Sequence, residues 1–102
     1  SYNNIGNVYY SLGDYDTALE YYNKALAIQR QVLGENHPDT ATSYNNIGGV
    51  YDSLGDYDTA LEYYNKALLI FEQKLPQTHP NILTVKRNIS KCEYMNVINN
   101  KQ

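Results

Sequence analysis

Apolar residues recur along the chain at the spacing of an α-helix. In the first segment they stand three or four residues apart, which places them on one helical face; they are Tyr2, Ile5, Tyr9 and Leu12. Glycine and aspartate interrupt the pattern at positions 13 and 14, and a second stripe with the same steps covers residues 15–33. The pattern predicts a first helix, A, and a second helix, B, joined by a tight turn.

Capping signals give the helix boundaries. Asp14 and Asp16 stand where carboxylates accept hydrogen bonds from free amides and meet the positive end of a helix dipole. Pro38 suits a first helical position because it has no amide hydrogen to lose there. We therefore expect five helices, near residues 1–12, 15–33, 38–54, 57–75 and 80–98.

The chain repeats itself with a period of 42 residues, because Ser1-Tyr2-Asn3-Asn4-Ile5-Gly6 returns at Ser43. Residues 1–33 and 43–75 are identical at 27 of 33 positions. A third copy begins at His79-Pro80, as at His37-Pro38, and then diverges. We interpret the chain as one domain, with repeat one at 1–42 (its helix A truncated at the N-terminus), repeat two at 43–79, and a divergent half repeat or capping helix at 80–102. Residues 99–102 are expected to fray.

Glycine within a helix is destabilising and is retained where two backbones approach closely. Gly6 and Gly48 occupy such positions in the two A helices. We expect Gly6 to lie against Ala18, where helix A crosses helix B, with tyrosines filling the space on either side. Such an antiparallel pair leaves one apolar face open until the next pair stacks on it.

The repeated residues resemble the signature of the tetratricopeptide repeat. In the first unit they are Tyr2, Ile5, Gly6, Tyr9, Gly13, Tyr15, Ala18, Tyr22 and Ala25. Tyrosine replaces the usual tryptophan, and the period exceeds the common length of about 34 residues. The longer unit, its Gly-Glu-Asn-His-Pro connection and its paired asparagines resemble the kinesin light chain subtype. The resemblance implies an all-α fold, a right-handed α-solenoid of antiparallel helix pairs with about two and a half repeats.

Charge and composition exclude several classes of partner. The formal charge of −3 and the isoelectric point near 5.2 provide no basic field for nucleic acid or for an anionic membrane surface. There is no apolar run long enough to cross a bilayer and no leader segment before the patterned sequence. We expect a cytoplasmic protein that binds neither nucleic acid nor membrane.

No arrangement of side chains indicates catalysis, a cofactor or a metal. His37 and His79 each precede a proline at the same repeat position, so stacking holds them one repeat apart and helix capping is expected. Cys92 is the single cysteine and cannot form an intramolecular disulfide. A phosphate loop and a Ser-His-Asp ordering are both missing. We expect a protein that is not an enzyme.

The resemblance implies a concave groove lined by the A helices, where a peptide of a partner protein lies. Carried over position by position, the expected groove residues are Asn3, Asn7, Tyr10, Asn45, Gly49, Asp52, Arg87, Lys91 and Tyr94. Asparagine suits such a groove because its amide both donates and accepts hydrogen bonds. The alternative is that Asn3 and Asn45 only bond neighbouring helices.

The groove also suggests the class of ligand. Arg87 and Lys91 are four residues apart, so both can reach one anionic group, and we rank an acidic peptide first. The alternatives are an ordinary solvated helix face, or neutralisation of the two cations by Asp52.

Three function classes remain: a peptide-binding scaffold, a structural segment whose repeats associate with one another, and a regulatory segment of a larger enzyme or sensor. The scaffold is preferred because of its open groove. Both ends of the stack leave apolar residues uncovered, on helix A of repeat one and around Val97, so we also expect end-to-end self-association.

Overall fold

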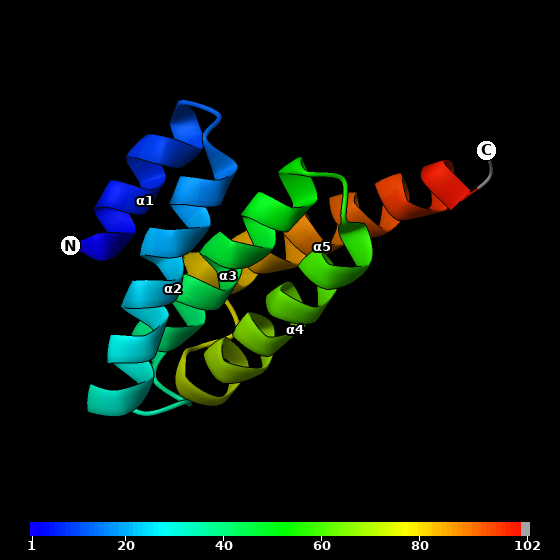
Figure 1. Ribbon diagram of the computed structural model, residues 1–102. Coiled ribbons are helices and arrows are strands. Elements are labelled where there is room, and N and C mark those ends of the chain that lie inside the picture. Colours follow the sequence, from blue (N-terminus) through cyan, green and yellow to red (C-terminus); the bar gives the residue numbers. More distant parts are fainter. Residues whose placement is uncertain (101–102) are drawn as a thin grey trace.

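Five α-helices, with no strand among residues 1–100, make up the computed structural model, which describes residues 1–100. They are α1 (Tyr2–Ser11), α2 (Tyr15–Val32), α3 (Pro38–Ser53), α4 (Tyr57–Lys74) and α5 (Pro80–Asn100). Consecutive helices run in opposite directions and each packs on the next (Figure 1). The all-α repeat architecture is confirmed, whereas the right-handed sense of the stack and the exact repeat boundaries stay predictions.

Side-chain caps fix the helix starts as expected. The carboxylate of Asp14 accepts a hydrogen bond from the Thr17 amide at 3.2 Å. The imidazole Nδ1 of His37 accepts one from the Asp39 amide at 3.0 Å, and His79 does the same for the amide two residues later. The two histidines are therefore helix caps at successive repeat positions.

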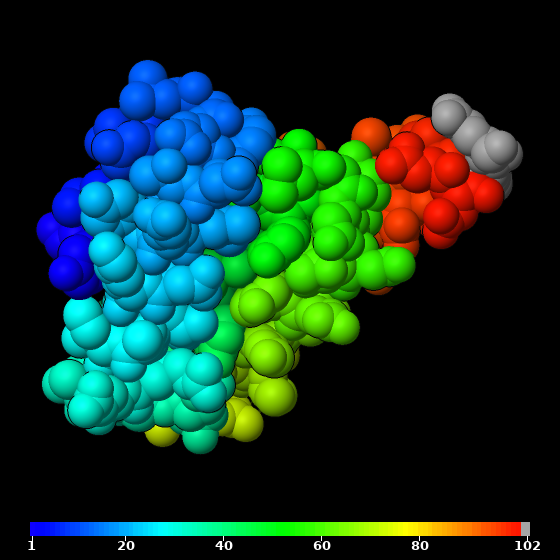
Figure 2. Space-filling model, in the orientation of Figure 1, coloured from blue at the N-terminus to red at the C-terminus, as the bar shows by residue number. Residues whose placement is uncertain are grey.

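The helix ends agree with the expected boundaries except at the C-terminus. Asn99 and Asn100 continue α5, so the expectation that they fray is wrong, while residues 101–102 lie outside the described part. The physical reason is that neither glycine nor proline follows Pro80 in the sequence, so nothing interrupts the backbone hydrogen bonds of α5. In the space-filling view its C-terminal end projects beyond the other helices (Figure 2).

The core lies between the helix pairs in a flat molecule of 44 × 32 × 19 Å. Its larger cluster joins α2, α3, α4 and the start of α5, and includes Tyr22, Leu26, Tyr44, Ile47 and Val50. A smaller cluster brings Cys92 of α5 against Ala60 and Tyr64 of α4. Cys92 packs there as a small buried side chain, and burial raises the pKa of its thiol to about 11.

Each helix A approaches its helix B most closely at a glycine. A β-carbon added to Gly6 would stand 2.6 Å from the Tyr22 ring, and one added to Gly48 would stand 2.7 Å from the Tyr64 ring and 3.2 Å from the carbonyl oxygen of Ala60. The nearest group to Gly6 is the Tyr22 ring, one turn further along α2 than Ala18. In repeat two Ala60, the counterpart of Ala18, also meets its glycine, and the contact of Gly6 with Ala18 itself stays a prediction.

Gly48→Ala should lower the free energy of unfolding by about 1–3 kcal/mol, because the buried Tyr64 ring and a backbone carbonyl leave no room for a methyl group. Gly49→Ala is the matched control. Its β-carbon would meet the Tyr64 hydroxyl at 3.8 Å, an ordinary contact, so it should gain up to about 1 kcal/mol from helix propensity. Urea unfolding of both variants measures the difference. If the two substitutions change the free energy of unfolding equally, the close contact of Gly48 with α4 is refuted.

Candidate functional site

A hollow of about 180 Å³ lies where α1, α3 and α5 come together. Its lining consists of Asn7, Tyr10, Tyr22, Asn45, Asn46, Gly49 and Asn88. Four of the nine residues expected in the groove are thus gathered in one place, from helices far apart in the sequence. Amide and hydroxyl groups dominate the lining, so the hollow offers both donors and acceptors.

A second hollow, of about 640 Å³, adjoins the first at the N-terminal end of α1. The two share Asn7 and Asn46 in their linings. Most of its lining residues are polar ones of α1 and α3, but apolar atoms, among them those of Tyr2, Ala25 and Ile28, make up the larger part of its surface. The two hollows together, which share Asn7 and Asn46, combine amide and hydroxyl groups with apolar surface along the A helices, and we call them the groove.

Asn3 and Asn45 each bond a neighbouring helix, and each also lines one of the two hollows. The Asn3 amide donates to the Ser43 hydroxyl at 3.2 Å. The Asn45 side-chain oxygen accepts from the Asn88 amide at 3.3 Å. Both side chains are half-buried. They tie the A helices together, and only part of their hydrogen-bonding capacity remains free for a ligand.

Two tyrosines of the B helices extend beneath the A helices to the groove. The Tyr22 hydroxyl donates to the side-chain oxygen of Asn7 at 2.5 Å, and the Tyr64 hydroxyl donates to Asp52 at 3.0 Å. Burial, with a smaller contribution from Tyr10, raises the pKa of Tyr22 to about 12. Burial and then the Asp52 carboxylate raise the pKa of Tyr64 further. Both hydroxyls therefore remain protonated donors at neutral pH.

Asp52 does not neutralise the two cations of α5. Its carboxylate accepts from Tyr64, and no ion pair within residues 1–100 includes Arg87 or Lys91. Arg87, Lys91 and Tyr94 are exposed on α5, outside the linings of the two hollows. Tyr10 stays at the groove, where its hydroxyl hydrogen-bonds the Ser53 hydroxyl at 2.6 Å.

Two asparagines and one tyrosine of the lining are absent from the nine expected groove residues. Asn46 and Asn88 follow Asn4 at successive intervals of 42 residues, so the repeat itself contained the signal. The Tyr22 ring fills the space beside Gly6, and its hydroxyl bonds Asn7 at the groove. The sequence feature that could have indicated this is Gly6 on the facing helix, because a residue without a side chain lets the Tyr22 ring pass under helix A.

In the part of the chain that the structure describes, no three His, Cys, Asp or Glu side chains stand close enough together to ligate a metal ion. None of the described helices has the length and apolar character that crossing a bilayer requires.

The comparisons with known proteins agree with the architecture. The family model described as tetratricopeptide repeat matches residues 1–73. A nucleotide-binding leucine-rich repeat (NLR)-like protein of Hyaloscypha variabilis is 50% identical over 40 residues, which are 39% of this chain and 4% of that protein. The chain therefore spans a small fraction of that curated relative.

Tyr22→Phe should lower the free energy of unfolding at pH 8 by about 1 kcal/mol, because the variant lacks one hydrogen bond and that is the net contribution of such a bond. The pKa of Tyr22 in the folded protein, about 12, lies above the ordinary tyrosine pKa of 10.0, so the Tyr22 contribution to stability is fully present below pH 10 and is lost as the pH rises towards 12. Between pH 8 and pH 11 the free energy of unfolding of the wild type should fall by roughly 1 kcal/mol more than that of the variant. Urea unfolding of both proteins at both pH values tests this. If their free energies of unfolding fall by the same amount, the raised pKa of Tyr22 is contradicted.

Proposed function

The chain belongs to the tetratricopeptide-repeat family, and from that premise we propose that it binds a peptide segment of a partner protein in the concave groove along α1, α3 and α5. Tetratricopeptide repeats in general mediate protein–protein interaction. The observation that carries the proposal is the pair of adjoining hollows joined at Asn7 and Asn46. Their amide-rich walls suit an extended backbone, whose carbonyl and amide groups need partners irrespective of its sequence.

Asn46 is the asparagine best placed to hold such a backbone. It is half-buried, lines both hollows, and takes part in none of the side-chain hydrogen bonds within residues 1–100. Asn7 accepts from Tyr22 through its oxygen, so its amide nitrogen is available to donate to a peptide carbonyl. These two side chains form the centre of the proposed site, and Asn3 and Asn45 support it by holding the A helices in place.

We further propose that the bound segment is acidic. Arg87 and Lys91 are exposed on one helix and have no carboxylate partner within residues 1–100. A carboxylate of the ligand would meet two cations four residues apart. The attraction is solvent-exposed, so it contributes modestly to affinity and weakens as salt is added.

A second candidate is a regulatory repeat segment within a larger protein. The match to a segment covering 4% of an NLR-like protein favours it. In that setting the groove would bind a peptide of the same or of an associated chain. The 42-residue period and the asparagine pairs support the kinesin light chain-like subtype for either candidate.

Asn46→Ala should weaken the binding of a short fluorescein-labelled polyglutamate peptide by about 2–10-fold, the effect of losing one hydrogen bond. The matched control is Asn65→Ala, an exposed asparagine of α4, which should leave affinity unchanged. Fluorescence anisotropy measures both. If Asn46→Ala binds as tightly as the wild type, the groove is not the site.

The double variant Arg87→Ala, Lys91→Ala should weaken binding of the same peptide and flatten its dependence on salt. The charge-matched control is Lys24→Ala, Lys74→Ala, which removes two exposed cations from the B helices. Anisotropy titrations at low and high salt separate the two variants. If both double variants lose the same affinity for the peptide, only net charge matters, and Arg87 and Lys91 are ordinary solvated residues.

A further inference from the structure

Repeat two differs from repeat one at two of the expected groove positions, and both differences are on one side of α3. Gly49 stands where α1 has Asn7, and Asp52 stands where α1 has Tyr10. Gly49 and Asp52 are three residues apart in the helix, so they are neighbours on its surface. The first difference removes a side chain from the groove, and the second introduces a carboxylate beside the same place.

Gly49 contributes only backbone to the wall of the hollow of about 180 Å³, which it lines together with Tyr10 of α1 and Asn88 of α5. A β-carbon added to Gly49 would find the Tyr64 hydroxyl at 3.8 Å, an ordinary van der Waals contact. The hollow is therefore open above this glycine. It can receive an unbranched side chain of a bound peptide.

Asp52 places an unpaired negative charge next to that space. It is half-buried, one of its carboxylate oxygens accepts from the Tyr64 hydroxyl at 3.0 Å, and it belongs to no ion pair within residues 1–100. The same Tyr64 hydroxyl is the group close to the β-position of Gly49, so one phenol connects the carboxylate with the hollow. After burial, the Asp52 charge is the next cause that raises the pKa of Tyr64 on α4 and of Cys92 on α5.

The chemistry of Asp52 selects the class of ligand group. A ligand carboxylate would be repelled by it, and an apolar group would cover a half-buried charge without giving it a partner. A positively charged donor satisfies the free oxygen. Lysine suits this place better than arginine, because one oxygen is already engaged by Tyr64 and a planar guanidinium binds best to two free carboxylate oxygens.

We propose that the groove contains a subsite for a lysine side chain of the bound peptide, formed by Tyr10, Gly49 and Asp52. The unbranched stem lies in the hollow beside Gly49, and the ammonium group donates to the free oxygen of Asp52. Arg87 and Lys91, exposed on α5, meet carboxylates of flanking residues. The preferred ligand thus carries one lysine among acidic residues. This subsite rests on the proposed binding of an acidic peptide in the groove and refines it.

Two fluorescein-labelled glutamate-rich peptides, which differ only at one central residue, test the subsite. One has lysine there, and the other has norleucine, which keeps an unbranched stem and lacks the ammonium group. The wild type should bind the lysine peptide about 3–10-fold more tightly, the effect of one charge-assisted hydrogen bond. Asp52→Asn should remove this preference, while its amide oxygen still accepts from the Tyr64 hydroxyl. Fluorescence anisotropy measures all four affinities as a double-mutant cycle.

Glu20→Gln is the charge-matched control, because it removes an exposed carboxylate of α2 and should keep the preference for lysine. If the wild type binds both peptides equally, or if Glu20→Gln and Asp52→Asn reduce the preference equally, the subsite is overturned. In the second case net charge alone explains the preference.

The double variant Gly49→Asn, Asp52→Tyr decides the question if Asp52→Asn fails to fold. It gives repeat two the groove residues of repeat one, and the Tyr64 hydroxyl gains an amide oxygen as acceptor, as Tyr22 has in Asn7. This variant should bind the two peptides with equal affinity, and a retained preference for lysine would overturn the subsite.

Asn46→Ala separates a failure of the subsite from a failure of the proposed function. If it weakens the binding of both peptides while the wild type shows no preference for lysine, the groove binds peptides and only the subsite is overturned. If it weakens the binding of neither peptide, the groove is not the binding site, and the proposed function fails together with the subsite.

Discussion

The contact on which the structure depends is a tyrosine ring lying against a glycine backbone. Tyr22 passes under Gly6, and Tyr64 passes under Gly48. Without a side chain on helix A, the ring of helix B fills the crossing and its hydroxyl emerges on the groove side, where it bonds Asn7 or Asp52. One pair of residues therefore sets both the separation of the helices and the polarity of the groove, and a methyl group at the glycine would disturb both.

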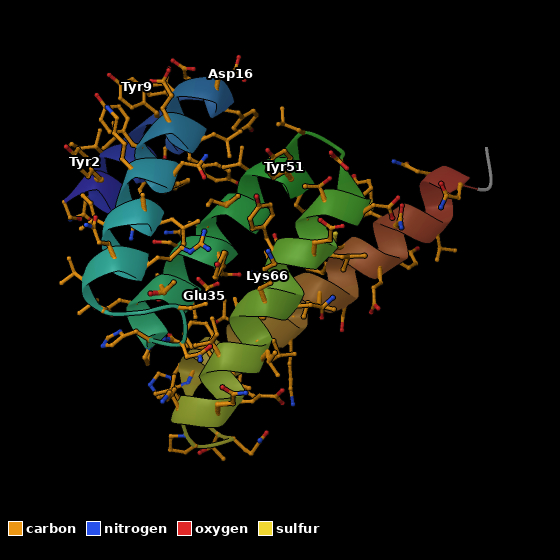
Figure 3. All side chains as sticks on the ribbon, turned by 60° about the horizontal axis from the view of Figure 1, so that its bottom comes forward. Tyr2, Tyr9, Asp16, Glu35, Tyr51 and Lys66 are labelled. Carbon is orange, nitrogen blue, oxygen red and sulfur yellow. The ribbon has the colours of Figure 1, made fainter. Side chains whose placement is uncertain are left out.

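A second set of contacts fastens the two repeats together. The Tyr44 hydroxyl donates to Glu35 in the connection between α2 and α3, and Arg30 forms an ion pair with the same carboxylate at 2.6 Å. The hydrogen bond from Tyr44, and then the Arg30 charge, keep the pKa of Glu35 below its usual range, while burial raises the pKa of Tyr44 to about 12. Lys66 lies over the Tyr44 and Tyr63 rings near Glu35 (Figure 3). Lys24 repeats this placement over Tyr2 and Tyr21, so the cation accompanies the aromatic pair in each unit.

Two of the differences between the repeats, at positions 7/49 and 10/52, compensate for one another, because each repeat keeps an acceptor for its buried tyrosine hydroxyl. In repeat one the buried hydroxyl of Tyr22 bonds Asn7. In repeat two the corresponding position is Gly49, which has no acceptor side chain, and the hydroxyl of Tyr64 bonds Asp52 instead, at the position of Tyr10. These two substitutions thus preserve one hydrogen bond, while its acceptor changes from the side-chain amide of Asn7 to the carboxylate of Asp52. A ligand would meet chemically distinct halves on an almost identical scaffold.

The sequence by itself determined the five helices, their caps and their pairing, because apolar spacing, Asp14, His37 and Pro38 act within a few residues of the backbone they organise. The resemblance to the tetratricopeptide repeat also indicated the side of the A helices where Asn7, Tyr10, Asn45 and Gly49 meet, since the family's positions carry over to each repeat. Only the tertiary structure decided which groups are already occupied: that Asn3 and Asn45 bond neighbouring helices, that Asp52 bonds Tyr64 and not a cation, and that Gly6 meets Tyr22 before Ala18. These outcomes depend on distances between side chains of different helices, and a helical pattern fixes the face a residue occupies without fixing the atom it reaches.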